Sequence, residues 1–262
     1  MAEDRQVATA DGARGAQGAR GARPRLDTFI FDLDGTLLDT LPDLVELTNT
    51  ALREQGFPER SVDEIHSFVG GGAEMLIRLA VPEGTSEERF NITLQRWRDL
   101  YPSIGIRYTK PYPHMIEALR ELKRRGVRLG VLSNKFDQGV KETIGIYMPG
   151  IFEVLHGECD YIPRKPDPTG ILYTMRELDG APERTAYVGD SRNDAATSRR
   201  AGTFTISAAW GYTDGELLRA VEPDAVIEDP LELLQFAPAP AEGGEPASAA
   251  PAAAGPAAGE GE

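Results

Sequence analysis

Two aspartates stand directly after a short apolar run near the start of the chain. Residues 29–31 are apolar, Asp32 and Asp34 come next, and Gly35 and Thr36 complete the segment. An apolar run of this kind is typical of a buried strand, and open α/β sheets bind ligands beyond the carboxyl ends of their strands. Alternate residues of an extended chain share one side, so the two carboxylates would lie together and would need a cation or a proton between them. A capped turn is the alternative, but it would need only one aspartate.

Further polar side chains with phosphate or metal chemistry stand at other expected strand ends and helix starts. They are Ser133 and Asn134 after one apolar run, Lys165 before a proline-fixed helix start, and Asp190 and Asp194 around the end of another run. A hydroxyl and an amide can bind phosphate oxygens, and a lysine can neutralise their charge. Because the carboxyl ends of parallel strands meet at one edge of a sheet, we expect these groups to converge on the first aspartate pair.

Helices and strands are expected to alternate after residue 110. The predicted helices are residues 115–125, 138–143, 168–178 and 193–200, and the predicted strands are residues 127–132, 152–155, 185–188, 204–207 and 225–227. This alternation indicates an α/β fold with a doubly wound, mostly parallel sheet and right-handed crossovers. The last strand is expected at an edge of the sheet.

Residues 41–108 have a different pattern, which predicts helix almost throughout. The amphipathic segments are residues 41–55, 62–68, 73–79 and 87–100. An insertion directly after the aspartate pair would lie over the carboxyl edge of the sheet and exclude water from the reaction. A helical domain without a role at the site is the alternative. We therefore divide the folded chain into an α/β core, residues 25–40 and 109–236, and a helical cap, residues 41–108.

The two ends of the chain and its charge limit the possible partners. Residues 1–24 and 237–262 are poor in large apolar side chains, and the second stretch is almost wholly Ala, Pro, Gly and Glu, so both are predicted to be disordered tails. The net charge of −14 disfavours nucleic acid or an anionic membrane surface as a partner. No apolar run approaches membrane-spanning length, and the single cysteine, Cys159, excludes an intramolecular disulfide. We expect a cytoplasmic enzyme, monomeric or homodimeric.

Together these motifs resemble the phosphatases of the haloacid dehalogenase superfamily, and most closely their phosphoglycolate phosphatase-like branch. The resemblance covers about residues 26–235. It implies that Asp32 is a nucleophile that forms an aspartyl-phosphate and that Asp34 is the general acid and then the base. It also implies that Ser133 binds the transferring phosphoryl group and that Lys165 neutralises its charge. Thr36 and Asn134 are expected on the phosphate-binding side of the same site.

Mg²⁺ is the cofactor that the resemblance implies. Its expected ligands are the Asp32 carboxylate, the Asp34 backbone carbonyl and Asp190, while Asp194 would either support the metal or orient Lys165. A few carboxylates supplemented by water and phosphate oxygens suit this ion. Phosphoryl transfer depends chiefly on positioning and charge neutralisation, which such a site supplies.

The cap sequence excludes two related reactions, and Asp34 in the core disfavours a third. Phosphonoacetaldehyde hydrolases use a cap lysine, and residues 41–108 contain none. β-Phosphoglucomutases carry a cap histidine shortly after the Asp–Thr pair, whereas residues 41–56 have none and His66 lies too far along. Haloacid dehalogenases lack an aspartate at the position of Asp34. A phosphatase acting on a small phosphorylated metabolite remains.

Residues 70–72 resemble the glycine loop that phosphoglycolate phosphatases point into the site. We therefore expect Gly71 and Gly72 to approach the substrate closely, although a flexible helix connector would have the same composition. Arg78 is a candidate for binding a substrate carboxylate; the alternative is that it is a surface residue without a role at the site. The expected substrate is 2-phosphoglycolate. An inorganic pyrophosphatase, a sugar-phosphate phosphatase and a 5′-nucleotidase would use the same core, and a non-catalytic phospho-ligand-binding or phosphoaspartate receiver-like protein is the alternative from a different class.

Overall fold

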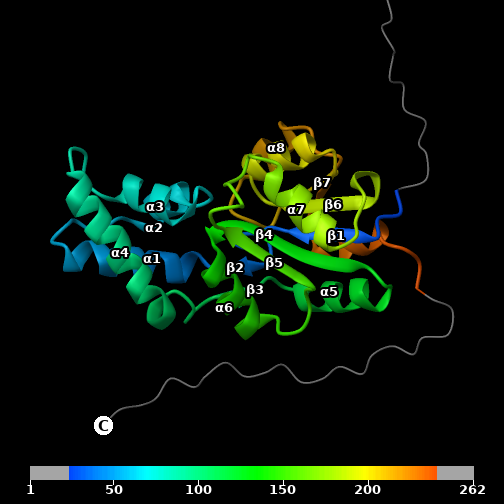
Figure 1. The fold of residues 1–262 in the computed structure, drawn as a ribbon, viewed down its shortest axis with the longest axis horizontal. Coiled ribbons are helices and arrows are strands. Elements are labelled where there is room, and N and C mark those ends of the chain that lie inside the picture. Colours follow the sequence, from blue (N-terminus) through cyan, green and yellow to red (C-terminus); the bar gives the residue numbers. More distant parts are fainter. Residues whose placement is uncertain (1–23, 241–262) are drawn as a thin grey trace, which may run out of the picture.

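The computed structural model describes residues 24–240, which form an α/β core with a helical cap beside it (Figure 1). The predicted tails, residues 1–24 and 237–262, lie almost wholly outside the described residues. The boundary of the second tail was placed too early, because Ala237 is buried against the core.

The core contains a six-stranded sheet whose order is β5-β4-β1-β6-β7-β8, with all neighbours parallel. The strands are β1 (Thr28–Phe31), β4 (Arg128–Phe136), β5 (Val154–Glu158), β6 (Thr185–Gly189), β7 (Phe204–Ala208) and β8 (Ala225–Ile227). The central β1 is flanked by β4 and β6, so the carboxyl ends of these three strands lie side by side. The predicted α/β fold is confirmed, and β8 lies at an edge as expected.

Helices cover both faces of the sheet, and Figure 1 shows α7 and α8 on one side with α5 and α6 on the other. These helices are α5 (Met115–Arg124), α6 (Asp137–Tyr147), α7 (Thr169–Glu177) and α8 (Arg192–Ala201), followed by a short α9 (Gly215–Arg219). Two 3₁₀ turns, η1 (Pro182–Arg184) and η2 (Pro230–Gln235), complete the core. Phe29 and Phe31 of β1 pack into the cluster beneath α5 and α6, whereas Ile30 packs beneath α7 and α8. Because successive residues of a strand point to opposite sides, β1 contributes buried side chains to both faces of the sheet.

Strand β4 is longer than predicted. The sequence indicated an end at residue 132, but the strand continues to Phe136, which pairs with Glu158 of β5 after a register shift. An irregularity of this kind re-aims side chains without ending the strand. Ser133 and Asn134 consequently belong to the strand itself.

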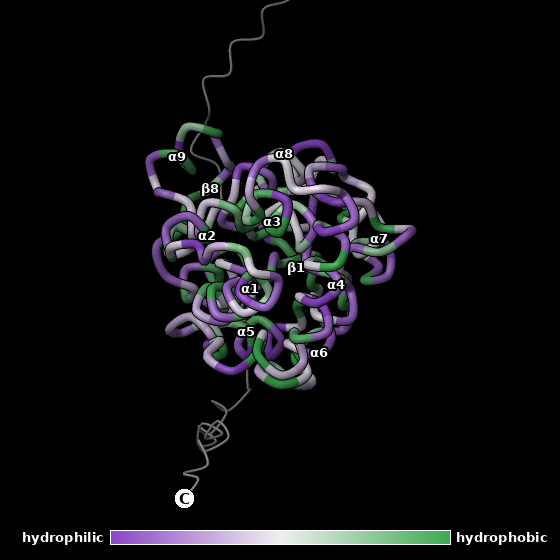
Figure 2. The backbone as a smooth tube through the Cα atoms, turned by 90° about the vertical axis from the view of Figure 1, so that its left-hand side faces the viewer, coloured by the Kyte–Doolittle hydropathy of each residue, from purple (hydrophilic) through white to green (hydrophobic). Residues whose placement is uncertain are grey.

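The cap consists of four helices, α1 (Leu41–Glu54), α2 (Val62–Phe68), α3 (Gly72–Ala80) and α4 (Glu87–Ile104). Each presents apolar residues to a separate hydrophobic cluster around the buried Trp97, and the purple and green stretches alternate along these helices in Figure 2. Within α1, Leu44, Leu47 and Ala51 are buried, which is the spacing of one helix face. The cap thus carries its own apolar core.

A short antiparallel ribbon joins the cap to the core and was not predicted. Strand β2 (Leu38–Asp39) pairs with β3 (Lys110–Pro111), so the chain leaves and re-enters the core at one place. Asp43, at the start of α1, is fully buried there. Its carboxylate accepts hydrogen bonds from the backbone N–H groups of residues 107–109 at 2.7–3.0 Å and from the Thr109 hydroxyl at 2.6 Å.

Candidate active site

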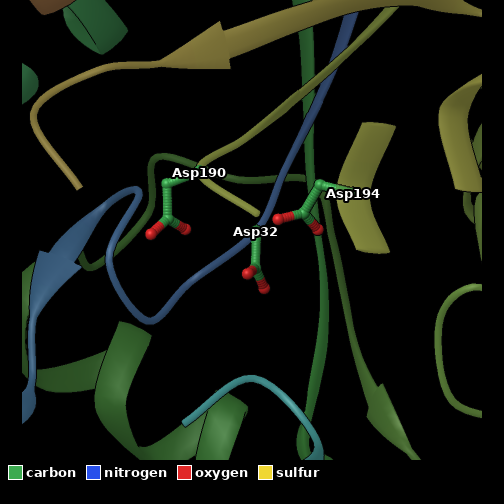
Figure 3. A group of neighbouring side chains, drawn as sticks. All are labelled: Asp32, Asp190 and Asp194. Atoms are coloured by element: carbon green, nitrogen blue, oxygen red, sulfur yellow. The ribbon is translucent and has the colours of Figure 1, made fainter. Parts of the chain in front are cut away.

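Three buried carboxylates gather at the carboxyl edge of the sheet. Asp32 follows β1, Asp190 follows β6, and Asp194 lies in the first turn of α8. One oxygen of each lies within 4.8 Å of one oxygen of the others, and Figure 3 shows the three side chains close together. The expected convergence arises because β1 and β6 are neighbours in the sheet.

Lys165 lies among these acids. Its Nζ is 2.6 Å from Asp194 Oδ1 and 2.9 Å from Asp32 Oδ1, and it donates to the Tyr187 hydroxyl at 3.0 Å. Burial lowers the pKa of Lys165, but Asp194 and Asp32 outweigh burial and hold that pKa well above its ordinary value. The lysine is therefore a fixed positive charge beside Asp32.

Asp194 has protein donors on both oxygens. Oδ1 accepts from Lys165, and Oδ2 accepts from the Ser191 backbone N–H at 3.0 Å and hydroxyl at 2.5 Å. The Ser191 hydroxyl also accepts from the Asp194 N–H, which completes a capping box at the start of α8. Of the two roles expected for Asp194, this arrangement favours the orientation of Lys165.

The cluster retains excess negative charge. Burial raises the pKa of Asp190 to about 8, with Asp194 and Asp32 adding to the effect. Burial also raises the pKa of Asp32 to about 6, because the opposing effect of Lys165 is only partial. Asp32 Oδ1 is buried, and the Lys165 ammonium contacts it as an ion pair without hydrogen-bond geometry. Carboxylate oxygens that carry more negative charge than one lysine neutralises fit a hard divalent cation such as Mg²⁺.

The Asp190 side chain is held by the segment that follows the first aspartate pair. Thr36 donates its hydroxyl proton to Asp190 Oδ1 at 3.0 Å, and the Tyr212 backbone N–H donates to Oδ2 at 2.7 Å. Gly35 has a φ of +83°, and a Cβ there would lie 2.4 Å from Asp190 Oδ2. Thr36, expected on the phosphate side, thus has its hydroxyl directed to a carboxylate.

Asp34 lies beside a second buried lysine. Its Oδ1 accepts from the Thr40 hydroxyl at 2.8 Å, and the Nζ of Lys135 donates to Oδ1 at 3.1 Å and to Oδ2 at 3.4 Å. The Lys135 ammonium also lies 5.1 Å from the centroid of the Tyr101 ring. Sequence reasoning missed Lys135, although it directly follows the Ser133–Asn134 pair.

Ser133 and Asn134 are both buried at the site, but they differ in their contacts. Ser133 lines a cleft with Asp32 and Asp34. The Asn134 amide is bound by the protein instead: Oδ1 accepts from the Lys165 N–H and Nδ2 donates to the Gly70 carbonyl, both at 2.7 Å. Asn134 therefore holds Lys165 in place, together with the glycine loop of residues 70–72, called the cap loop below.

The cap loop reaches the site through Gly70 and Gly72, which both line the cleft beside Asp34. Gly71 lines neither that cleft nor the wider one next to it. Arg78 is also absent from both clefts. Its guanidinium pairs with Glu87 and stacks 3.5 Å from the centroid of the Phe90 ring, on the surface of the cap. The structure thus does not bring Gly71 or Arg78 to the site.

Two clefts open from the carboxylates. The first encloses about 40 Å³ between Ser133 and Lys135 on the core side and apolar cap residues that include Leu76 and Trp97. The second encloses about 400 Å³ between α2 and the loop that carries Tyr212. Sequence reasoning gave Tyr212 no role. Its hydroxyl accepts from the backbone N–H groups of residues 40 and 41, at the entrance to the cap.

A doubly wound core, an inserted helical cap and an acid cluster around a buried lysine define an α/β protein with a polar site at the carboxyl edge of its sheet. The model of the haloacid dehalogenase-like hydrolase family matches residues 29–208, and the chain belongs to that family.

Relatives and a solved structure support the same assignment. The chain is similar to phosphoglycolate phosphatase from Aquifex aeolicus, with 33% identity over 208 residues that cover 79% of this chain and 94% of that protein. It is 32% identical over 225 residues to phosphoglycolate phosphatase 1 from Pseudomonas aeruginosa, covering 84% of this chain and 82% of that protein. A crystal structure from Haemophilus somnus, described as a predicted phosphoglycolate phosphatase, has a TM-score of 0.76 with 26% identity and covers 80% of this chain and 97% of that one.

Proposed function

We propose that this phosphatase is a Mg²⁺-dependent phosphomonoester hydrolase that acts through an aspartyl-phosphate intermediate on 2-phosphoglycolate. The observation that carries the proposal is the placement of Lys165 between Asp32 and Asp194 in a buried site. A carboxylate can attack a phosphate dianion only where the repulsion between them is neutralised, and a fixed ammonium beside Asp32 supplies part of that neutralisation.

In the first step, a carboxylate oxygen of Asp32 forms a bond to phosphorus while the bond to the ester oxygen breaks. Asp34 donates its proton to the departing alkoxide, so the leaving group departs as an alcohol. In the second step, Asp34 takes a proton from a water molecule that attacks the aspartyl-phosphate, which releases inorganic phosphate and regenerates Asp32. Asp194 and Asn134 keep Lys165 in position throughout.

Asp32, Asp190 and the backbone carbonyl of Asp34 would hold the metal ion. When bound, Mg²⁺ offsets the negative charge of the phosphoryl group and of the acid cluster. Thr36 and the Tyr212 N–H orient Asp190 for this purpose.

The named relatives and the small first cleft support 2-phosphoglycolate. A pyrophosphatase, a sugar-phosphate phosphatase and a 5′-nucleotidase would share the core. A larger leaving group would have to lie in the second cleft, which Asp190 and Asp214 make more acidic than the first. We further propose a cytoplasmic protein, monomeric or homodimeric, without a nucleic-acid partner. Within residues 24–240, no helix has the length and apolar character needed to cross a membrane.

The test is a screen of phosphorylated metabolites with Mg²⁺, followed by the Asp32→Asn variant on the best substrate. An amide is not a nucleophile of this kind, so kcat should fall by at least about 1,000-fold. Asp99→Asn, on the exposed face of α4, is the matched control and should keep full activity. Retention of a tenth of the wild-type rate by Asp32→Asn would contradict the covalent mechanism.

A further inference from the structure

Lys135 carries a buried positive charge that the proposed chemistry does not use. Its side chain is only 4% exposed, yet it lines the first cleft together with Ser133 and Asp34. Its ammonium donates to both carboxylate oxygens of Asp34. Burying an ammonium is costly unless it is paired, so its presence at this place requires an explanation.

A purely structural explanation does not fit the surroundings of Lys135. The acceptor that compensates its charge is Asp34, which the proposed mechanism requires as a proton donor. A lysine ammonium that stayed on Asp34 would stabilise the charged carboxylate and would oppose that role. An ammonium has three N–H donors, so Lys135 can also bind an anion inside the cleft.

The first cleft has the size and charge that suit a short anionic leaving group. Its volume of about 40 Å³ would hold roughly three water molecules. Leu76, Trp97 and other apolar cap residues form the opposite wall, so an anion entering here would lose most of its hydration. Such an anion therefore needs a cation within the cleft itself.

Lys135 is the one ammonium or guanidinium group that lines either cleft in the described part of the chain. Lys165 is already bound to Asp32 and Asp194. Arg164, close to the cap loop, is paired with both Glu158 and Glu74. Asp32 and Asp34 line both clefts, but among the described residues the second adds Asp190 and Asp214 without a lysine or arginine. It would therefore repel an anionic leaving group more strongly than the first.

We propose that Lys135 is the specificity residue that binds the carboxylate of a short phosphorylated hydroxy acid in the first cleft. When the substrate enters, the ammonium exchanges Asp34 for the substrate carboxylate, and Asp34 turns to the ester oxygen. The inference rests on the proposed function, and it assigns the leaving group to the first cleft rather than to the second. Lys135 thus provides the positive charge for the substrate carboxylate that was expected from Arg78.

The experiment compares two substrates of nearly equal size. 2-Phosphoglycolate has a carboxylate at the position where 2-hydroxyethyl phosphate has an uncharged hydroxymethyl group. Values of kcat/KM for both are measured with Mg²⁺ for the wild type, Lys135→Met and Lys135→Arg. Lys141→Met, which removes an exposed lysine paired with Asp137 on α6, is the matched control. Thermal unfolding of each variant identifies any that is misfolded.

We expect the wild type to prefer 2-phosphoglycolate and Lys135→Met to reduce the ratio of the two kcat/KM values by about 100-fold. Lys135→Arg should retain most of the preference, and Lys141→Met should retain all of it. An equal loss on both substrates in Lys135→Met would mean that Lys135 only positions Asp34 and would overturn the inference. If Lys135→Met does not fold, the wild-type ratio of kcat/KM for the two substrates is the test. A wild type that does not prefer 2-phosphoglycolate to 2-hydroxyethyl phosphate also overturns the inference.

The two proposals fail in different ways. A wild type that hydrolyses other phosphomonoesters but does not discriminate between the paired substrates leaves the proposed phosphatase mechanism intact and removes the role of Lys135. A wild type that hydrolyses no phosphomonoester with Mg²⁺ contradicts the proposed function itself.

Discussion

The side-chain amide of Asn134 donates a hydrogen bond to the backbone carbonyl of Gly70 at 2.7 Å. This contact joins the end of a core strand to the cap loop across 64 residues of sequence. On its other side the same amide accepts from the Lys165 N–H. One buried side chain therefore sets both the position of the cap loop and that of the lysine beside Asp32.

Replacing Asn134 with Asp should release the cap loop. A carboxylate can still accept from the Lys165 N–H, but it cannot donate to Gly70 and it repels that carbonyl. We expect kcat/KM to fall by about 10- to 100-fold and amide hydrogen exchange in the cap loop to accelerate. Asn91→Asp, on the exposed face of α4, is the control for the added charge. Unchanged exchange in the loop would show that the Gly70 contact does not hold the cap.

The glycine loop offers a matched pair of substitutions. Gly72 has a φ of +80°, and a Cβ there would lie 2.8 Å from the Asn134 carbonyl oxygen. Gly71 has an ordinary φ of −95°, and its Cβ would lie 2.8 Å from Cγ and 2.9 Å from Cβ of Met75, which is exposed on the cap and lies outside both clefts. Gly72→Ala should therefore displace the loop at the site and lower activity by at least about tenfold, while Gly71→Ala should have a clearly smaller effect on activity. Steady-state kinetics on 2-phosphoglycolate distinguishes the two, and equal effects would exclude close backbone approach as the reason for Gly72.

Asp34→Asn should separate the two chemical steps. An activated aryl phosphate needs little proton donation to its leaving group, so Asp32 should still be phosphorylated. Hydrolysis of the intermediate needs a base and should stop, because an amide cannot accept the proton from water. Intact-mass spectrometry after rapid quenching should then detect a phosphoenzyme that is missing in Asp32→Asn. Its absence in Asp34→Asn would count against the assigned roles.

The acid cluster predicts how stability without metal depends on pH. The folded-state pKa values of Asp32 and Asp190 are raised to about 6 and about 8, so the folded protein keeps protons that the unfolded chain has released above about pH 4. The folded state binds more protons in this window, and its stability falls as the pH rises from about 4 to about 8. Mg²⁺ replaces those protons and should stabilise the protein more at about pH 8 than at about pH 6.

Thermal unfolding with a chelator and with Mg²⁺ across this pH range measures the effect. Asp190→Asn is the control, since it should flatten the pH dependence and weaken stabilisation by Mg²⁺. A melting temperature of the metal-free protein that rises steadily from about pH 4 to about pH 8 would refute the linkage.

Local patterns were sufficient to predict the fold class, although not the β2–β3 ribbon or the full length of β4. The amphipathic spacing predicted α2 at its observed bounds, Val62–Phe68, and the apolar run before Asp32 predicted the central strand. The convergence of Asp32, Asp190 and Lys165 followed from the shared edge of parallel strands.

Contacts between cap and core were not predictable in the same way. The contact between Asn134 and Gly70 depends on how two separately packed bodies meet, which no local periodicity encodes. Arg78 instead pairs within the cap, with Glu87. Lys135 was missed because lysines are normally solvated, and only the continuation of β4 to Phe136 buries it. His114, directly before α5, has a φ of +61°, a left-handed conformation that the helical pattern after it does not reveal.

The Asp43 carboxylate has a consequence for how such an enzyme acquires new substrates. Because Asp43 binds the backbone of residues 107–109, the two ends of the cap are joined to each other at the junction between the cap and the core. Changes in the length or sequence of the insertion are then absorbed within it, at a small cost in loop-closure entropy. Evolution can exchange the cap wall of the first cleft while the phosphoryl-transfer residues and Lys135, all in the core, stay unaltered. We therefore expect this junction to be a permissive site for grafting caps from related hydrolases.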